Sequence, residues 1–124
     1  CGSGSIGLEA LSRGAKHVFF VDIDTTMIKK NSGGLPDALK ENIQIISRSY
    51  EMALDFIKER DIVFFDPPWE LKGSYKQVFD LWVSSSQSKI LIFEHSKAQA
   101  LDFSGAPFQK NYSYGLTQLT VFRK

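Results

Sequence analysis

The sequence predicts an α/β fold built on a doubly wound, mostly parallel sheet. Short apolar runs rich in β-favouring residues, at 18–21, 43–46, 61–65 and 90–93, alternate with stretches of helical periodicity. Strands that alternate with helices are typical of parallel sheets, whose strands are covered on both faces. Two further runs, 108–112 and 117–122, flank a turn near Tyr114-Gly115 and predict a closing antiparallel hairpin.

The composition is that of an ordinary globular protein of at most one domain. The 124 residues are 43% hydrophobic and 23% charged, with a net charge of +1, which neither demands nor excludes a nucleic-acid partner. No apolar run is long enough to span a membrane. The one cysteine, Cys1, rules out an internal disulfide framework and fits a reducing cytoplasm. With two distant histidines beside it, there is no metal-ligand spacing, so no metal site is predicted.

Helices are predicted between the strands. The first helix follows residues 2–7 and ends at Arg13-Gly14. Asp24 is placed to cap a second helix, which the segment 31–34 breaks. Pro36 starts one or two further turns, and Ser47 or Ser49 caps another short helix before residue 58. After a loop at 72–74 comes the clearest apolar stripe of the chain, expected in the core and formed by Tyr75, Val78, Phe79, Trp82 and Val83.

Residues 2–7 form a glycine loop that satisfies the G-x-G-x-x-G pattern. Such a loop normally follows a hydrophobic strand, and no strand precedes it here. We therefore expect a fragment that lacks the N-terminal segment and the first strand of the sheet. That strand belongs between those ending at Asp22 and Asp66, so we expect these two strands not to pair with each other, leaving a gap or a place for a strand of another chain.

The glycine loop and the next strand end predict a nucleoside cofactor. Glycines let a backbone turn tightly and let a ligand approach closely, which assigns Gly2, Ser3 and Gly4 to the cofactor site. An acidic residue about 20 positions later binds ribose hydroxyls in such sites, and Asp22 occupies that place. Ile23, which follows it, belongs to the same site. The pattern alone leaves a dinucleotide and S-adenosylmethionine as alternatives.

Two residues after the 43–46 strand join this prediction. Ser49 and Tyr50 follow that strand, and the carboxyl ends of parallel strands share one edge of a sheet. We therefore assign both to the cofactor site.

The segment Asp66-Pro67-Pro68-Trp69 carries the candidate chemistry. It follows a buried strand, and its two prolines fix φ and lack N–H groups, so the chain leaves the sheet as a stiff, extended elbow. Asp66 and the Pro67 carbonyl can each accept a hydrogen bond from an exocyclic amine, while Trp69 can stack on a planar base. A hydride-transfer enzyme has no use for this arrangement, which favours S-adenosylmethionine over a dinucleotide.

These motifs together resemble a known family. Residues 2–15, the 66–69 segment, Phe93-Glu94-His95 and the Tyr-Gly-Leu-Thr of residues 114–117 are similar, in order, to motifs of the RsmD-type 16S ribosomal RNA guanine-N2 methyltransferases. The chain differs in having Asp22 where the family usually has a longer acid and Ser49 where it often has Asp or Asn. The family's basic N-terminal segment is absent.

The resemblance implies a Rossmann-like S-adenosylmethionine-dependent methyltransferase domain over residues 1–124. The implied substrate is a guanine in ribosomal RNA or the small ribosomal subunit, and the implied protein is a cytoplasmic monomer with Asp66, Pro67, Pro68 and Trp69 as catalytic residues. An adenine-N6 methyltransferase would use the same tetrapeptide. A non-catalytic nucleotide-binding or RNA-binding domain is the alternative from another class.

Overall fold

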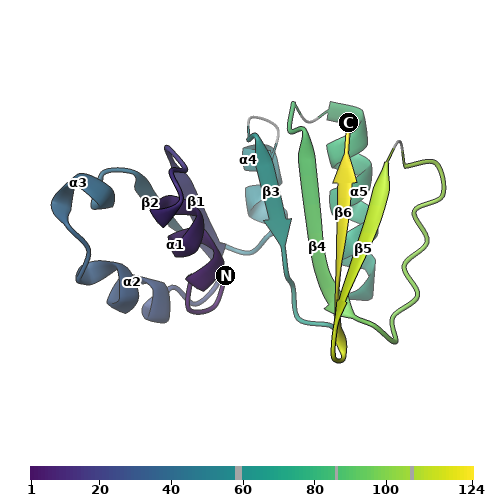
Figure 1. The fold of residues 1–124 in the computed structure, drawn as a ribbon, viewed down its shortest axis with the longest axis horizontal. Helices are drawn as coiled ribbons and strands as arrows, with labels where there is room; N and C mark the ends of the chain where they lie inside the picture. Colours follow the sequence, from purple (N-terminus) through teal and green to yellow (C-terminus); the bar gives the residue numbers. More distant parts are fainter. Residues whose placement is uncertain (58–59, 86, 107) are drawn as a thin grey trace. The chain divides into compact units, whose positions relative to one another are not determined.

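The computed structural model describes residues 1–57, 60–85, 87–106 and 108–124 as two compact units, Cys1–Ala53 and Leu54–Lys124 (Figure 1). The sequence predicts at most one domain, because the chain has only 124 residues. Each unit has its own small sheet. Among the described residues, no helix has the length and apolar character needed to cross a membrane.

The first unit is a parallel strand pair with helices. Its elements are α1 (Ser5–Ser12), β1 (Val18–Asp22), α2 (Thr26–Gly33), α3 (Asp37–Lys40), β2 (Ile43–Ser47) and the 3₁₀ turn η1 (Glu51–Ala53). β1 and β2 pair in parallel with Asp22 opposite Ser47, so both carboxyl ends lie at the same edge. The connection through α2 and α3 is the crossover that parallel strands require.

Two glycines let α1 begin and pack against its neighbours. Gly4, which precedes the helix, has φ +77°, and a Cβ there would lie 3.0 Å from Cγ1 of the buried Ile28 and closer still to Cδ1. Gly7 lies within α1, where a Cβ would lie 2.6 Å from Cζ of Phe20 and 2.8 Å from Cγ1 of Val18, both in β1. The glycine pattern therefore has a packing role as well as any ligand role.

Replacement of Gly7 by alanine is expected to destabilise the protein by about 1–3 kcal/mol, because the new methyl group overpacks against Phe20. Gly33, also helical, has open space around its Cβ position. The matched control Gly33→Ala is therefore expected to stabilise the protein by roughly 0.5–1 kcal/mol through helix propensity. Urea unfolding of both variants measures the difference. Equal stability of the Gly7 variant and the unmodified protein would refute the packing argument.

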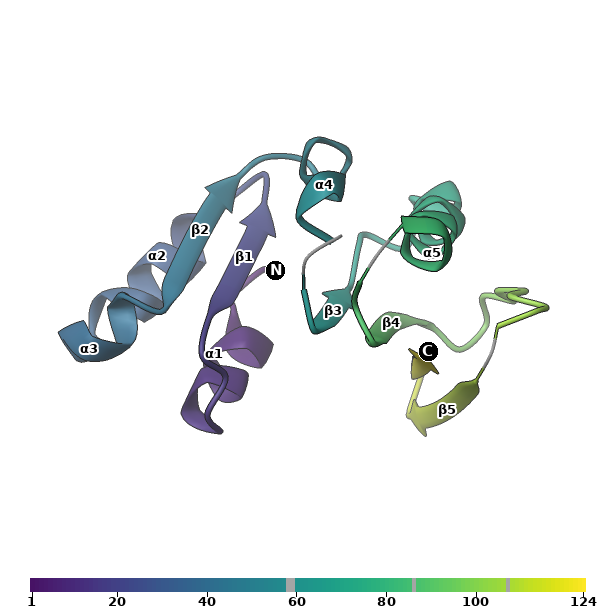
Figure 2. The ribbon, with the colours of Figure 1, turned by 90° about the horizontal axis from the view of Figure 1, so that it is seen from above.

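The second unit is a four-stranded mixed sheet with helices. Its elements are α4 (Leu54–Ile57), β3 (Ile62–Phe65), α5 (Lys72–Ser85), β4 (Ile90–Ser96), β5 (Gln109–Tyr114) and β6 (Thr117–Arg123). The strand order is β3-β4-β6-β5, with β3 and β4 parallel and the other two pairs antiparallel. Figure 2 shows α5 lying along one face of this sheet. The predicted closing hairpin is confirmed, with Gly115 at φ +57° in its turn.

The core of the second unit is aromatic. Tyr75, Val78 and Trp82 of α5 are completely buried, as are Leu91, Phe93 and Phe122 of the sheet. The rings of Tyr75 and Phe93 meet edge to face with centroids 5.2 Å apart. The apolar stripe of α5 is thus confirmed as core, except that Val83 at its end is 48% exposed.

Several sequence predictions of element bounds were wrong. The segment 72–74 is helical rather than a loop, because the Ser74 amide and hydroxyl both donate to the Leu71 carbonyl and start α5 early. α2 continues through Gly33 instead of breaking at residue 31. β4 reaches Ser96 because it pairs with β6 along all seven residues, a long-range contact invisible to local patterns.

The strand that ends at Asp22 and the strand that precedes Asp66 belong to different units. β1 pairs with β2 in one sheet, and β3 pairs with β4 in the other. The expectation that a further strand belongs between β1 and β3 stays a prediction. The α/β class is confirmed, and the described residues form one small parallel sheet and one small mixed sheet.

Candidate active site

The glycine loop and Asp22 are joined by hydrogen bonds in the first unit. Oδ2 of Asp22 accepts the Gly2 amide at 3.0 Å and also contacts the amine of Cys1, while Oδ1 accepts the Asp24 amide at 3.2 Å. The Asn31 side chain donates to the Ser3 carbonyl at 2.9 Å, which holds the loop against α2. The strand end, the loop and the helix therefore form one hydrogen-bonded assembly at the carboxyl edge of β1.

Asp22 is ionised more readily than an ordinary aspartate. Partial burial by itself would raise the pKa of its carboxyl group, but hydrogen bonds from the amine of Cys1 and the Gly2 amide outweigh it and lower the pKa. A carboxylate has about four acceptor positions, and backbone donors already use three of them. Asp22 thus organises the loop and keeps limited capacity for a further hydroxyl donor.

The sequence predicted Asp24 as the cap of α2, but the N-cap residue is Thr25, and Asp24 lies one residue before it. Oδ1 of Asp24 accepts the amide of Thr26, the first helical residue, at 2.9 Å. The Thr25 hydroxyl is instead hydrogen-bonded to Ser47 Oγ, 2.7 Å away. This bond links the segment after β1 to the end of β2, beside the edge formed by Asp22 and Ser47.

The remaining predicted cofactor residues differ in accessibility. Ile23, directly after Asp22, is 79% exposed and offers an apolar surface to a planar ring. Ser49 and Tyr50 are half-buried after β2. Hydrogen bonds from the Ser49 side chain and, less strongly, from Tyr50 lower the pKa of Glu51. Sequence reasoning missed Glu51, which no motif marks and which engages both residues assigned to the site.

In the second unit, the Asp-Pro-Pro-Trp segment leaves β3 as the predicted elbow. Pro67 is buried and anchors the elbow, whereas Asp66, Pro68 and Trp69 are exposed. The exposed fraction of Trp69 is 43%. The Pro68 carbonyl accepts the Leu71 amide at 3.0 Å, closing a turn that presents Trp69. The Asp66 carboxylate and the Trp69 ring are thus exposed, and the carbonyl of the buried Pro67 receives no backbone hydrogen bond among the described residues.

Two further residues belong to this edge of the second unit. Phe65 of β3 is in register with Phe93 of β4, so Asp66 and Glu94 are the next residues on adjacent parallel strands. Desolvation raises the pKa of both carboxyl groups, and the charge of Asp66 raises that of Glu94 further. The hydroxyl of the buried Tyr75 donates to the Glu94 carbonyl at 2.8 Å. Burial and, to a smaller extent, the negative charges of the two carboxylates raise the pKa of Tyr75 to about 12.

Neither residue was singled out from sequence for this site. Tyr75 belongs to the apolar stripe of α5 and was assigned to the core, which is also where its ring lies. Glu94 was noted only within the family resemblance, although an acid that follows an apolar strand is the same signal that marked Asp66.

His95 has a structural role. It is 2% exposed, and its ring nitrogens lie 2.9 Å from the Ser96 carbonyl and 2.9 Å from Thr120 Oγ1. Both nitrogens are thereby engaged between β4 and β6. In the part of the chain that the structure describes, no group of three or more His, Cys, Asp or Glu side chains could hold a metal ion.

Comparison with known proteins identifies the family. A family model described as conserved hypothetical protein 95, the RsmD family, matches residues 1–123. The chain belongs to the RsmD family. Among curated members, ribosomal RNA small subunit methyltransferase D of Haemophilus influenzae is 41% identical over 81 residues, covering 55% of this chain and 38% of that protein. "Putative rRNA methyltransferase YlbH" of Bacillus subtilis is 29% identical over 99% of this chain and 72% of its own.

Similar solved structures support the α/β fold. A Haemophilus influenzae protein described as a "putative methylase" has a TM-score of 0.74 and 30% identity, covering 98% of this chain and 81% of that one. A conserved hypothetical protein of Streptococcus pyogenes, with a TM-score of 0.82 and 24% identity over 99% of this chain and 81% of its own, shares the fold. The match thus spans less than half of the length of the first curated relative. It spans most of the length of the two solved structures.

Proposed function

We propose that residues 1–124 form an S-adenosylmethionine-dependent methyltransferase domain that modifies the exocyclic N2 amine of a guanine in small-subunit ribosomal RNA. The observation that carries this proposal is the Asp-Pro-Pro-Trp elbow, whose carboxylate and aromatic ring are exposed at the end of β3 in an RsmD-family chain. The names of the curated relatives support the ribosomal RNA substrate.

The elbow addresses the chemical difficulty of this reaction. The lone pair of an exocyclic amine is delocalised into the purine ring, which makes the nitrogen a poor nucleophile. Asp66 and the Pro67 carbonyl accept its N–H bonds, orient the nitrogen and stabilise the positive charge that develops on it. Trp69 stacks on the base and replaces stacking lost when the base leaves the RNA fold. Correct placement of the base lowers the barrier further.

The first unit supplies groups that fit the proposed cofactor. S-adenosylmethionine carries an activated methyl group, two ribose hydroxyls and an adenine ring. Gly2 has φ +50° with open space where a Cβ would stand, so a ligand can approach this part of the loop. Asp22 can accept from a ribose hydroxyl, and the exposed Ile23 can cover one face of the adenine. Ser3, Gly4, Ser49 and Tyr50 complete the proposed site.

The finer fold assignment is part of the same proposal. A parallel pair with a helical crossover in one unit, and a parallel pair followed by a closing antiparallel hairpin in the other, are components of a doubly wound methyltransferase sheet. We propose that the protein has this Rossmann-like architecture and acts in the cytoplasm as a monomer on ribosomal RNA or the small subunit.

The function is tested by methyl transfer from labelled S-adenosylmethionine to naked ribosomal RNA and to assembled small subunits, using the full-length gene product. Mass spectrometry of the digested RNA identifies the modified nucleoside. N2-methylguanosine is the expected product. Formation of N6-methyladenosine would show that the substrate is adenine instead of guanine. Binding of RNA without methyl transfer would favour a non-catalytic domain.

Asp22→Ala is expected to weaken S-adenosylmethionine binding by about 5–30-fold, because it removes a ribose acceptor and releases the glycine loop. Calorimetry measures this affinity. Asp37→Ala removes the same charge from an exposed side chain of α3 and serves as the control, with unchanged affinity expected. Preferential binding of a nicotinamide dinucleotide would contradict the cofactor assignment.

A further inference from the structure

Asp66 and Glu94 form a pair of acids at one edge of the second unit. They follow the registered residues Phe65 and Phe93 on adjacent parallel strands, whose backbones are about 4.8 Å apart in any sheet. The charge of Asp66 acts on Glu94 and on the hydroxyl of Tyr75. The geometry thus places a second carboxylate beside the one assigned to the reacting amine.

Among the described residues, these two carboxylates have no hydrogen-bond donors. In the described ranges, no backbone or side-chain group donates a hydrogen bond to either of them. The nearby Tyr75 hydroxyl is directed at the Glu94 carbonyl instead, 2.8 Å away. Two like charges that are partly desolvated and share no donor oppose folding, so an external donor would relieve an existing cost.

The chemistry of purines indicates which donor fits. Along its Watson–Crick edge, guanine presents the N1–H beside the N2 amine, two adjacent donors that match two adjacent carboxylates. Adenine presents a bare N1 beside its N6 amine, and this lone pair would face a carboxylate. A site that reads a base through partly desolvated polar groups discriminates against the base that leaves them unpaired.

We propose that Glu94 is a specificity-determining residue that accepts the N1–H of the target guanine while Asp66 holds its N2 amine. This inference rests on the proposed function, because it names how that site selects guanine over adenine. Tyr75 is the positioning residue of the pair, since its hydroxyl ties the backbone of Glu94 to α5.

The test compares two bases in one RNA. Once the unmodified protein has located the modified guanine, an RNA fragment carrying guanine or 2-aminopurine at that position is the probe. 2-Aminopurine keeps the N2 amine but has a bare N1. Glu94→Gln is expected to lower kcat/KM for guanine by about 10–100-fold. It should also raise the rate on 2-aminopurine relative to guanine, because the amide N–H can donate to N1.

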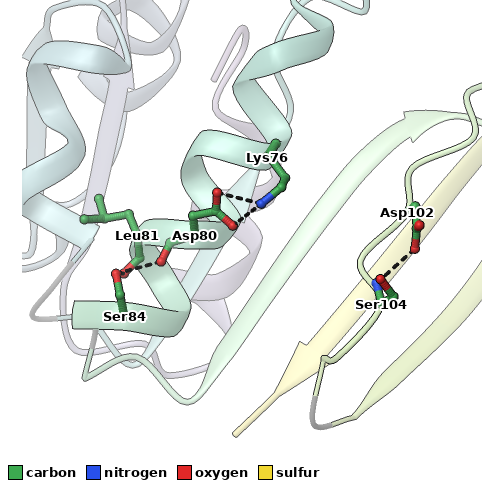
Figure 3. A network of polar contacts seen from close by, with 6 residues as sticks. All are labelled: Lys76, Asp80, Leu81, Ser84, Asp102 and Ser104. Carbon is green, nitrogen blue, oxygen red and sulfur yellow. Dashed lines mark hydrogen bonds and ion pairs between the residues drawn. The ribbon is translucent and has the colours of Figure 1, made fainter.

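The control removes the same charge elsewhere in the unit. Asp80 of α5 is exposed and pairs with Lys76 at 2.5 and 2.7 Å (Figure 3). Asp80→Asn is expected to leave both rates and their ratio unchanged. Binding of S-adenosylmethionine should be the same in all three proteins, which separates base recognition from loss of fold.

The outcomes distinguish the two claims. If the unmodified protein makes N2-methylguanosine and Glu94→Gln lowers both rates equally, Glu94 is structural and the inference is wrong. An unchanged guanine rate in Glu94→Gln would also overturn it. If the unmodified protein makes no N2-methylguanosine, the proposed function fails and the inference fails with it.

Discussion

Replacement of Asp66 by alanine is expected to lower the single-turnover rate of methyl transfer by about 100-fold or more, while the protein stays folded. The carboxylate's value to the reaction rises as positive charge develops on the amine, so its loss affects the transition state more than the bound substrate. Desolvation raises the pKa of this carboxyl group, so folding disfavours its negative charge, and removal of the charge is not expected to destabilise the protein. Rapid-quench methylation with saturating cofactor and RNA measures the effect.

Asp61 provides the control, because it directly precedes the first residue of β3 and is exposed. Asp61→Ala removes the same charge next to the same strand and should methylate at the rate of the unmodified protein. Acid should mimic the Asp66 variant, because protonation converts an acceptor oxygen into a donor. Since the pKa is raised, the rate should begin to fall at a higher pH than for an ordinary aspartate. A normal rate in Asp66→Ala would reduce Asp66 to a strand-end residue.

Replacement of Trp69 by alanine is expected to weaken productive RNA binding by roughly 5–150-fold, the equivalent of about 1–3 kcal/mol of base stacking. The ring is 43% exposed in a turn closed by the Pro68 carbonyl and the Leu71 amide, so it contributes little to the core. The loss should therefore appear in KM for RNA, with cofactor affinity nearly unchanged. Steady-state kinetics with calorimetry in parallel measures both quantities.

Trp69→Phe separates stacking from a structural role. Phenylalanine keeps an aromatic face and should restore most of the affinity for RNA, although it cannot reproduce the indole. If the alanine variant loses cofactor binding and RNA binding together, Trp69 supports the fold of the site instead of the base.

The sequence by itself determined the elements and their order. The alternation of β runs and helical stripes predicted every strand of the two sheets, because local periodicity reflects which face of each element is buried. It also located the elbow, because consecutive prolines constrain the backbone whatever surrounds them. Asp66, Trp69 and Asp22 were found in this way, and their roles stay predictions.

Only the tertiary structure decided what depends on neighbours distant in the chain. The pairing of β4 with β6 extended β4 to Ser96, and the packing of Phe20 against α1 explained Gly7. Glu94 became a candidate because the register of β3 and β4 sets it beside Asp66, 28 positions away in the sequence. Periodicity describes one element at a time, whereas register and side-chain contact arise between elements, so no local pattern could reveal that pair of carboxylates.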